Sequence, residues 1–200
     1  MLDQFSIAHA PATLSSMPRI LRTLLLSACC LLCVLAALVY SLTWHPGARE
    51  NAPVSCPASA PMLQPGQALK VMTWNVQYLA GKRYVFWYDL ADGSGQDLRP
   101  SSEDLAFSLD EVVRIMRDEQ PDIVLLQELH NGARASDYQN QLALLQERLS
   151  DLYPCSTQAF YWKAAFVPHP KILGSVGMQL GTLSRFQIAR AERLQLPLMP

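Results

Sequence analysis

The sequence predicts a layered α+β domain that follows a single membrane-spanning helix. An apolar run without any charged residue covers positions 23–42 and predicts the membrane helix. Beyond position 69, apolar patterns typical of strands alternate with apolar patterns at helical spacing. Their order is strand, helix, strand, helix, strand, strand, and the sequence contains no internal repeat. This order favours one domain whose sheets are covered by helices.

The apolar run reads TLLLSACCLLCVLAALVYSL. A helix needs about 20 apolar residues to cross the ~30 Å hydrocarbon core of a bilayer. Arg19 and Arg22 precede the run, and aromatic residues lie near its far end, as they do at membrane interfaces. Because basic residues mark the cytoplasmic side, we expect residues 1–22 in the cytoplasm, 23–42 as the transmembrane anchor, and the remainder on the extracytoplasmic side.

Two kinds of cleaved signal are the alternatives to an anchor. A signal peptide has a shorter apolar stretch of about 7–15 residues that ends in small residues, and no Ala-x-Ala site closes this run. A lipoprotein signal could end at Cys29, but most of the apolar residues follow that cysteine. The pattern therefore favours an uncleaved anchor.

Residues 43–68 are rich in proline and alanine, and we expect them to form an extended spacer. The globular domain is then expected over residues 69–200. The formal net charge is -1, which gives no broad basic surface for nucleic acid, although a local groove can still be basic. The spacer prolines are Pro46, Pro53, Pro57, Pro61 and Pro65.

Of the five cysteines, three lie inside the apolar run and behave there as small hydrophobic residues. Cys56 and Cys155 lie outside it, and no cysteine or histidine spacing suggests zinc. In an oxidising compartment these two cysteines can form a disulfide. The other interpretation is two free thiols, since the sequence does not give the distance between the two cysteines in space.

Each element of the domain follows from a local pattern. Continuous apolar or β-branched runs predict strands, and the run over 123–126 is typical of a strand buried on both faces. A serine before an acidic first turn predicts the start of one helix at Ser101, and Pro121 predicts its end. Ser136, with Gln139 as a capping-box partner, predicts the start of a second helix. The expected strands are 69–76, 123–126, 160–167 and 176–183.

Asn75 and Glu128 are the candidate site residues because each follows a predicted apolar strand. Strand ends are where open sheets place ligands, since the strand fixes the residue while its side chain reaches the crevice. A carboxylate there needs a partner or a metal, and one carboxylate with a neutral amide is a plausible partial shell for Mg²⁺. The alternative is that Glu128 is merely solvated and Asn75 caps a turn.

Two motifs resemble the endonuclease/exonuclease/phosphatase superfamily, which includes DNase I-like nucleases, neutral sphingomyelinases and inositol phosphatases. Trp74-Asn75 follows a strand, and Gln127-Glu128 closes the segment PDIVLLQE about 50 residues later. A third segment, VGMQLGTLSRF, is similar to the glycine-rich "LSR" strand of the family. The resemblance covers residues 69–197.

The resemblance implies a DNase I-like two-layered β-sandwich with helices outside and a divalent-metal site, for Mg²⁺ or Mn²⁺, at one end of the sheets. Glu128 would be the carboxylate ligand of the metal, and Asn75 would help to hold the metal or the scissile phosphate. Gln127 is expected to orient its neighbour, and His130 and His169 are expected to be loop residues. Arg185 could contact phosphate, although solvation is the commoner fate of such an arginine.

The sequence departs from the family pattern in its second half. An Asn-x-His strand, an Asp-x-Asn motif and a late Asp-His pair are expected in the family and do not occur here. We therefore expect only the first half of the sandwich, a domain that is C-terminally incomplete, and no catalysis by these residues alone.

Two functions follow as expectations. The first is a membrane-anchored, metal-dependent phosphoester hydrolase acting on nucleic acid, phospholipid or inositol phosphate. The second is a non-catalytic, membrane-tethered binding module or truncated pseudoenzyme. The sequence predicts the membrane as a partner and no protein partner.

Overall fold

A computed structural model of the chain describes residues 18–197, which form two units divided at Thr43 and Trp44. The first unit contains the helix α1 (Arg19–Leu42), 24 residues long with a mean hydropathy of 2.5 in its most apolar window. It is long and apolar enough to cross a membrane. The hydroxyl groups of Thr23 and Ser41 bond back to carbonyl groups of the preceding turn. Of the expected cytoplasmic segment 1–22, residues 1–17 lie outside the described part of the chain.

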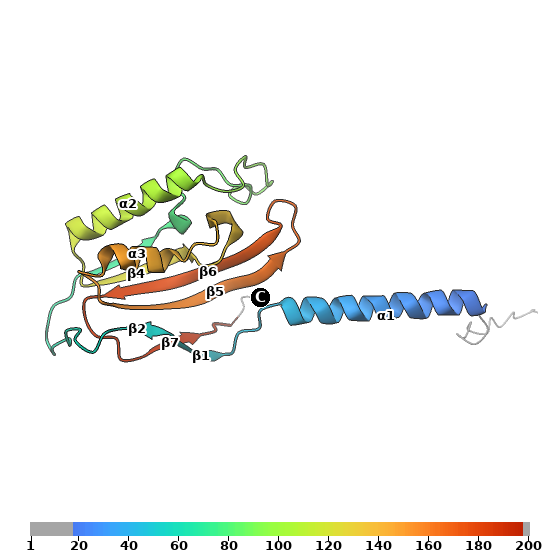
Figure 1. The fold of residues 1–200 in the computed structure, drawn as a ribbon, viewed down its shortest axis with the longest axis horizontal. Coiled ribbons are helices and arrows are strands. Elements are labelled where there is room, and N and C mark those ends of the chain that lie inside the picture. Colours follow the sequence, from blue (N-terminus) through green and yellow to red (C-terminus); the bar gives the residue numbers. More distant parts are fainter. Residues whose placement is uncertain (1–17, 198–200) are drawn as a thin grey trace, which may run out of the picture. The chain divides into compact units, whose positions relative to one another are not determined.

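The second unit is built on a five-stranded mixed sheet with the strand order β2-β5-β6-β4-β3 (Figure 1). The pair β3 and β4 is parallel, and the other neighbours are antiparallel. A second sheet consists of β1 and β7, which pair antiparallel. The strands are β1 (Arg49–Ala52), β2 (Val54–Ser55), β3 (Val71–Asn75), β4 (Ile123–His130), β5 (Cys155–Val167), β6 (Gly174–Ser184) and β7 (Ala191–Leu194).

Two helices, α2 (Ser102–Glu119) and α3 (Gln141–Leu149), cover one face of the main sheet, while β1 and β7 lie on its other side (Figure 1). The hydrophobic core forms between the helices and the sheet, because the apolar faces of both point inward. Its fully buried members include Met116 of α2, Leu145 of α3, and Val124, Leu126 and Leu183 of the strands.

The fold class expected from the sequence is confirmed: the second unit is α+β, with a mixed sheet that carries its helices on one face. The helix expected between Ser101 and Pro121 is also confirmed. Ser101 Oγ accepts the Asp104 backbone N–H at 3.1 Å, and Gln120 ends the helix in a left-handed conformation with φ 46°.

The start predicted for the second helix is wrong. Asp137 and Tyr138 have φ values of 52° and 61°, which a right-handed helix does not allow. The helix α3 instead begins at Gln141, where Asn140 Oδ1 accepts the Ala143 backbone N–H at 3.2 Å. The predicted capping serine, Ser136, is buried in a short 3-10 helix, η3 (Arg134–Ser136), and bonds elsewhere.

The expected spacer over residues 43–68 needs correction, because this segment supplies β1 and β2. Proline is compatible with edge strands, and Pro53 lies between the two strands rather than inside either. A disulfide joins Cys56, just after β2, to Cys155 at the start of β5. The second unit therefore begins at Trp44 rather than near Leu69.

Candidate functional site

Parallel pairing of β3 with β4 brings the two predicted site residues to the same end of the sheet. Asn75, the last residue of β3, lies opposite Gln127, so Glu128 is one position further along β4. The Val76 backbone N–H donates to the Gln127 carbonyl at 3.1 Å and closes the ladder at this point. The sequence placed each residue just after or at the end of a strand. Asn75 is the last residue of β3, whereas Glu128 lies inside β4, which continues to His130, and the register makes the two residues neighbours.

Glu128 lies in a β-bulge. On the β6 side, Leu126 pairs with Gly181 and Leu129 with Gln179, so two residues of β4 face one residue of β6. Glu128 has a φ of 57°, in the left-handed region that glutamate rarely occupies. Bulges re-aim side chains next to functional sites, and strained backbone persists where the surrounding structure holds it. The bulge and the left-handed backbone together fix where the Glu128 side chain leaves β4.

Asn75 makes the turn that follows β3. Its Oδ1 accepts the Gln77 backbone N–H at 2.9 Å, an Asx-type turn. The 3-10 helix η2 (Gln77–Leu79) has positive φ at all three residues, from 42° to 61°. The turn-capping role considered for Asn75 is thus present. It fixes the amide and leaves its Nδ2 and a second lone pair of Oδ1 available.

The Glu128 charge acts on three tyrosines. Burial, the hydrogen bond to Tyr88 and the Glu128 charge raise the pKa of Tyr78. Burial, with a contribution from the Glu128 charge, raises the pKa of Tyr88 to about 12 and that of Tyr161 to about 12. Asp89 raises the pKa of Tyr78 and Tyr88 further. The three phenols therefore stay protonated at neutral pH.

A second bulge places Tyr161 in this group. Phe160 pairs with Gln179 and Trp162 with Met178, so Tyr161 is the extra residue of β5. Its hydroxyl donates to Met178 Sδ at 3.6 Å. The aromatic run 84–88 was noticeable in the sequence, but Tyr78 and Tyr161 carried no signal, because bulges and left-handed turns cannot be deduced from apolar periodicity.

His130 is the last residue of β4 and is 6% exposed, so it is not the loop residue that the sequence suggested. Its ring stacks on the Tyr78 ring at 4.5 Å, and Nδ1 lies 3.0 Å from Ser136 Oγ. Burial lowers the pKa of His130 to about 4. The ring is therefore neutral at neutral pH and packs beneath the site.

The other polar residues considered in the sequence lie in three places. Gln127 Nε2 donates to Thr73 Oγ1 at 3.1 Å and to the Leu125 carbonyl at 3.2 Å, so it braces the strand that carries Glu128. His169 stacks on Trp87 in the loop between β5 and β6. Arg185 follows Ser184, which pairs with Ile123 at the start of β4, five residues and roughly 16 Å from Glu128 along the strand. Arg185 is therefore not part of this site.

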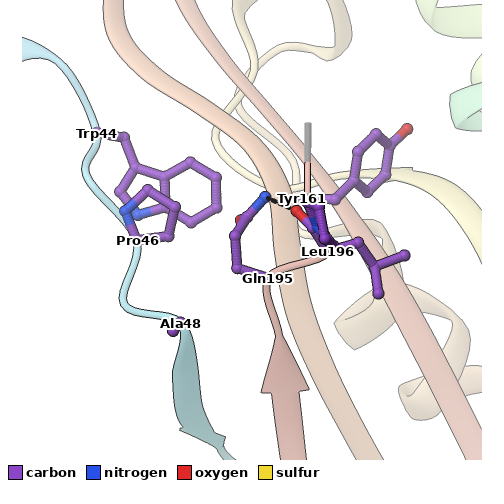
Figure 2. Close-up of a pocket in the computed structure, with 7 residues that line it drawn as sticks. Trp44, Pro46, Ala48, Tyr161, Gln195 and Leu196 are labelled. Atoms are coloured by element: carbon purple, nitrogen blue, oxygen red, sulfur yellow. Dashed lines mark hydrogen bonds between the residues drawn. The ribbon is translucent and has the colours of Figure 1, made fainter. Parts of the chain in front are cut away.

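A surface groove of the second unit lies apart from the candidate ligands. Figure 2 shows its lining residues, and neither Asn75 nor Glu128 is among them. Tyr161 borders the groove, but its ring points away from Trp44 and Pro46. The groove walls are mainly apolar and include no carboxylate side chain.

The donor set at the strand ends fits part of a divalent-cation site. Carboxylate and amide oxygens are the ligands that Mg²⁺ prefers, and it keeps several waters. Among residues 18–197, no ion pair involves Glu128, so its charge has no protein cation against it. Within the same residues, no group of three or more His, Cys, Asp or Glu side chains could hold a metal ion.

One family of known proteins matches a stretch of this chain that includes both Asn75 and Glu128. The profile of the Endonuclease/Exonuclease/phosphatase family matches residues 72–199. A solved structure, the endonuclease/exonuclease/phosphatase from Beutenbergia cavernae DSM 12333, is 23% identical, with a TM-score of 0.34. The match covers 58% of this chain and 26% of that one, so the chain spans about a quarter of its length. No curated protein sequence matches this chain.

Proposed function

This chain belongs to the endonuclease/exonuclease/phosphatase family, a family of hydrolases, and we propose that it carries the first metal-binding half of a divalent-metal-dependent phosphoester hydrolase. The observation that carries the proposal is the geometry of Glu128. Glu128 lies in a bulge of β4, beside the end of β3 at Asn75, and makes no ion pair among the described residues.

A bound Mg²⁺ or Mn²⁺ would polarise a phosphoryl oxygen and stabilise the leaving oxygen. Glu128 would supply the carboxylate ligand, and Asn75 would supply its amide to the metal or to the phosphate. The Asx-type bond to Gln77 orients the Asn75 amide before any ligand arrives. Tyr88, half exposed and protonated at neutral pH, would donate to a phosphoryl oxygen.

We do not assign the base that activates water to any residue of 18–197. His130 is buried, and burial holds its pKa low, while His169 stacks on Trp87 in a loop. The family motifs that the sequence lacks, the late Asp-His pair among them, would supply the base. The proposed activity therefore belongs to a complete domain of this family rather than to these residues alone.

We further propose that α1 anchors the domain in a membrane and that the domain lies on the extracytoplasmic side. The helix is long and apolar enough, and Arg19 and Arg22 lie at its N-terminal end. The disulfide between Cys56 and Cys155 supports the same side independently, because such bonds persist in oxidising compartments. A membrane-proximal phospholipid or inositol phosphate and a nucleic acid are both open as substrates, and no protein partner is proposed.

The test is a panel of DNA, RNA, sphingomyelin and phosphoinositides with Mg²⁺ or Mn²⁺, using a protein that contains the complete domain. Glu128→Gln should lower hydrolysis by more than about 100-fold, since a metal ligand supports several kcal/mol of transition-state stabilisation. Glu147→Gln, an exposed change on α3, is the matched control and should keep full activity. Full activity of Glu128→Gln would exclude the metal role of Glu128.

A non-catalytic, membrane-tethered binding module is the second candidate. The observation that favours it is that the Asn75 amide already has a structural role, since its Oδ1 accepts the Gln77 backbone N–H in the turn after β3. In the same panel this function predicts binding of one substrate class without turnover, and binding that Glu128→Gln leaves unchanged.

A further inference from the structure

A buried glutamine joins the two halves of the candidate site. Gln141, the first residue of α3, is 0% exposed. Its Oε1 accepts the His130 backbone N–H at 2.8 Å, and its Nε2 donates to the Tyr78 carbonyl at 2.7 Å. His130 lies two residues after Glu128, and Tyr78 lies three residues after Asn75. One side chain therefore connects the bulge that holds Glu128 with the turn that Asn75 begins.

Gln141 makes this contact where β3 ends and β4 loses its neighbouring strand. The parallel ladder stops at Asn75 and Gln127, because the chain then enters the left-handed turn of η2. Beyond that point β4 has no neighbouring strand on this side, and the His130 N–H needs another partner. The Gln141 amide offers one acceptor and one donor, as a peptide group of a neighbouring strand would. It takes the place of the missing strand.

Side-chain contacts reinforce the same connection. The His130 and Tyr78 rings stack with an interplanar angle of 7°, and the Tyr78 hydroxyl is hydrogen-bonded to that of Tyr88. Because the Glu128 charge acts on both phenols, a shift of the turn would change the surroundings of the carboxylate.

We propose that Gln141 is a positioning residue that sets the separation between the Asn75 amide and the Glu128 carboxylate. This inference rests on the proposed function, since it assigns to Gln141 the alignment of two ligands for one divalent cation. Residues that orient metal ligands through hydrogen bonds change metal affinity by about 10–100-fold when they are replaced. Gln141 would act in this way through the backbone of both ligands.

The test measures cation affinity of the full chain in detergent with Tb³⁺ as the probe, whose luminescence is excited through nearby tyrosines. Gln141→Leu removes both hydrogen bonds at similar volume and should weaken Tb³⁺ binding by about 10–100-fold while circular dichroism shows a folded chain. The matched control is Gln146→Leu. Gln146 lies on the same helix, but it accepts from Ser156 Oγ at 2.7 Å, far along the sheet from Glu128, and its loss should leave Tb³⁺ affinity unchanged.

Glu128→Gln separates the two proposals. Loss of Tb³⁺ binding in Glu128→Gln, with wild-type affinity in Gln141→Leu, overturns the role of Gln141 and leaves the proposed metal site standing. Undiminished binding in Glu128→Gln overturns the metal site itself, and the positioning role with it. Equal weakening by Gln141→Leu and Gln146→Leu shows a general loss of stability and also overturns the positioning role.

If Gln141→Leu does not fold, amide hydrogen exchange in the wild-type chain decides. Thermodynamic coupling is reciprocal. If the Gln141 hydrogen bonds strengthen cation binding, cation binding must strengthen the Gln141 hydrogen bonds equally. Saturating Mg²⁺ should slow exchange of the His130 N–H about tenfold more than that of the Asp122 N–H, which donates to the Lys70 carbonyl at the other end of β4. Equal slowing at both amides overturns the proposal.

Discussion

Glu128 and His130 show how one short stretch of β4 serves two purposes. The bulge contains Glu128, whose charge acts on nearby tyrosines, and two residues later His130 is buried against Tyr78. A neutral imidazole suits this position, because it fills the space with a flat surface and still bonds to the Ser136 hydroxyl. A charged imidazolium there would be poorly solvated.

The burial of His130 predicts an acid-sensitive fold. Its pKa is lowered to about 4 in the folded chain, against about 6.5 when unfolded, so below pH 6.5 only the unfolded chain takes up the proton. The stability is fully present above pH 6.5, and it falls by about 1.4 kcal/mol per pH unit as the pH drops toward 4. Urea unfolding of the full chain in detergent would measure this slope. His130→Gln should flatten the profile, and parallel profiles for the two chains would contradict it.

At the residue scale, sequence patterns predicted Asn75 and Glu128 because both follow apolar strands that are visible in the sequence. They did not predict the tyrosines around them. Tyr78 reaches the site through a left-handed turn and Tyr161 through a bulge, and both depend on backbone conformations that local composition does not determine. His130 was misplaced for the same reason, since β4 continues through the bulge to include it.

Among the helices, α2 is the one whose two ends are most clearly fixed by capping residues. Ser101 caps its first turn, Gln120 ends it in a left-handed conformation, and Arg117 reaches Asp151 beyond α3 with two hydrogen bonds at 2.8 Å. The Ser101 hydroxyl, followed by Tyr84 and Arg83, lowers the pKa of Asp104 in this turn. These side chains stabilise the N-terminus of α2 against the loop that precedes it.

Ser101→Ala should therefore lower the free energy of unfolding by about 1 kcal/mol, since the Asp104 backbone N–H loses its acceptor. Ser101→Asn should restore most of the loss. Because the pKa of Asp104 is depressed in the folded chain, its stabilising charge is present above about pH 4 and is lost as the pH falls further. Urea unfolding at pH 7 and pH 3 would check this: the cost of Ser101→Ala should be smaller at pH 3, and an equal cost would contradict the coupling.

The sequence located α2 well and α3 poorly for a physical reason. A cap and a proline mark both ends of α2 in the sequence itself. The start of α3 depends on Asp137 and Tyr138, whose left-handed backbone allows Ser136 to turn inward to His130. That choice is made by tertiary contacts, which override local capping preferences.

For the whole domain, the disulfide is the longest-range covalent constraint among residues 18–197. Cys56 and Cys155 are 99 residues apart, and the loop they close contains α2, α3, β3 and β4. Closing so long a loop restricts the unfolded chain far more than the folded one. The sequence alone did not decide whether these two cysteines form a disulfide, because their separation along the chain does not give the distance between them in space.

Reduction of this bond should lower the free energy of unfolding by about 2–5 kcal/mol. The measurement is urea unfolding of the full chain in detergent with and without dithiothreitol. The double variant Cys56→Ser, Cys155→Ser should match the reduced chain and no longer respond to the reductant. A response that persists in the double variant would assign the effect to Cys29, Cys30 or Cys33 of α1 instead.

The disulfide also decides what a protease can release. Residues 57–70 are almost entirely exposed, which makes them an accessible site for cleavage. A cut between residues 43 and 48 would free the sheet from α1. A cut between residues 57 and 70 would not, because Cys155 still holds Cys56 and everything N-terminal to it, the apolar helix included. Shedding through the second region would require reduction as well as proteolysis.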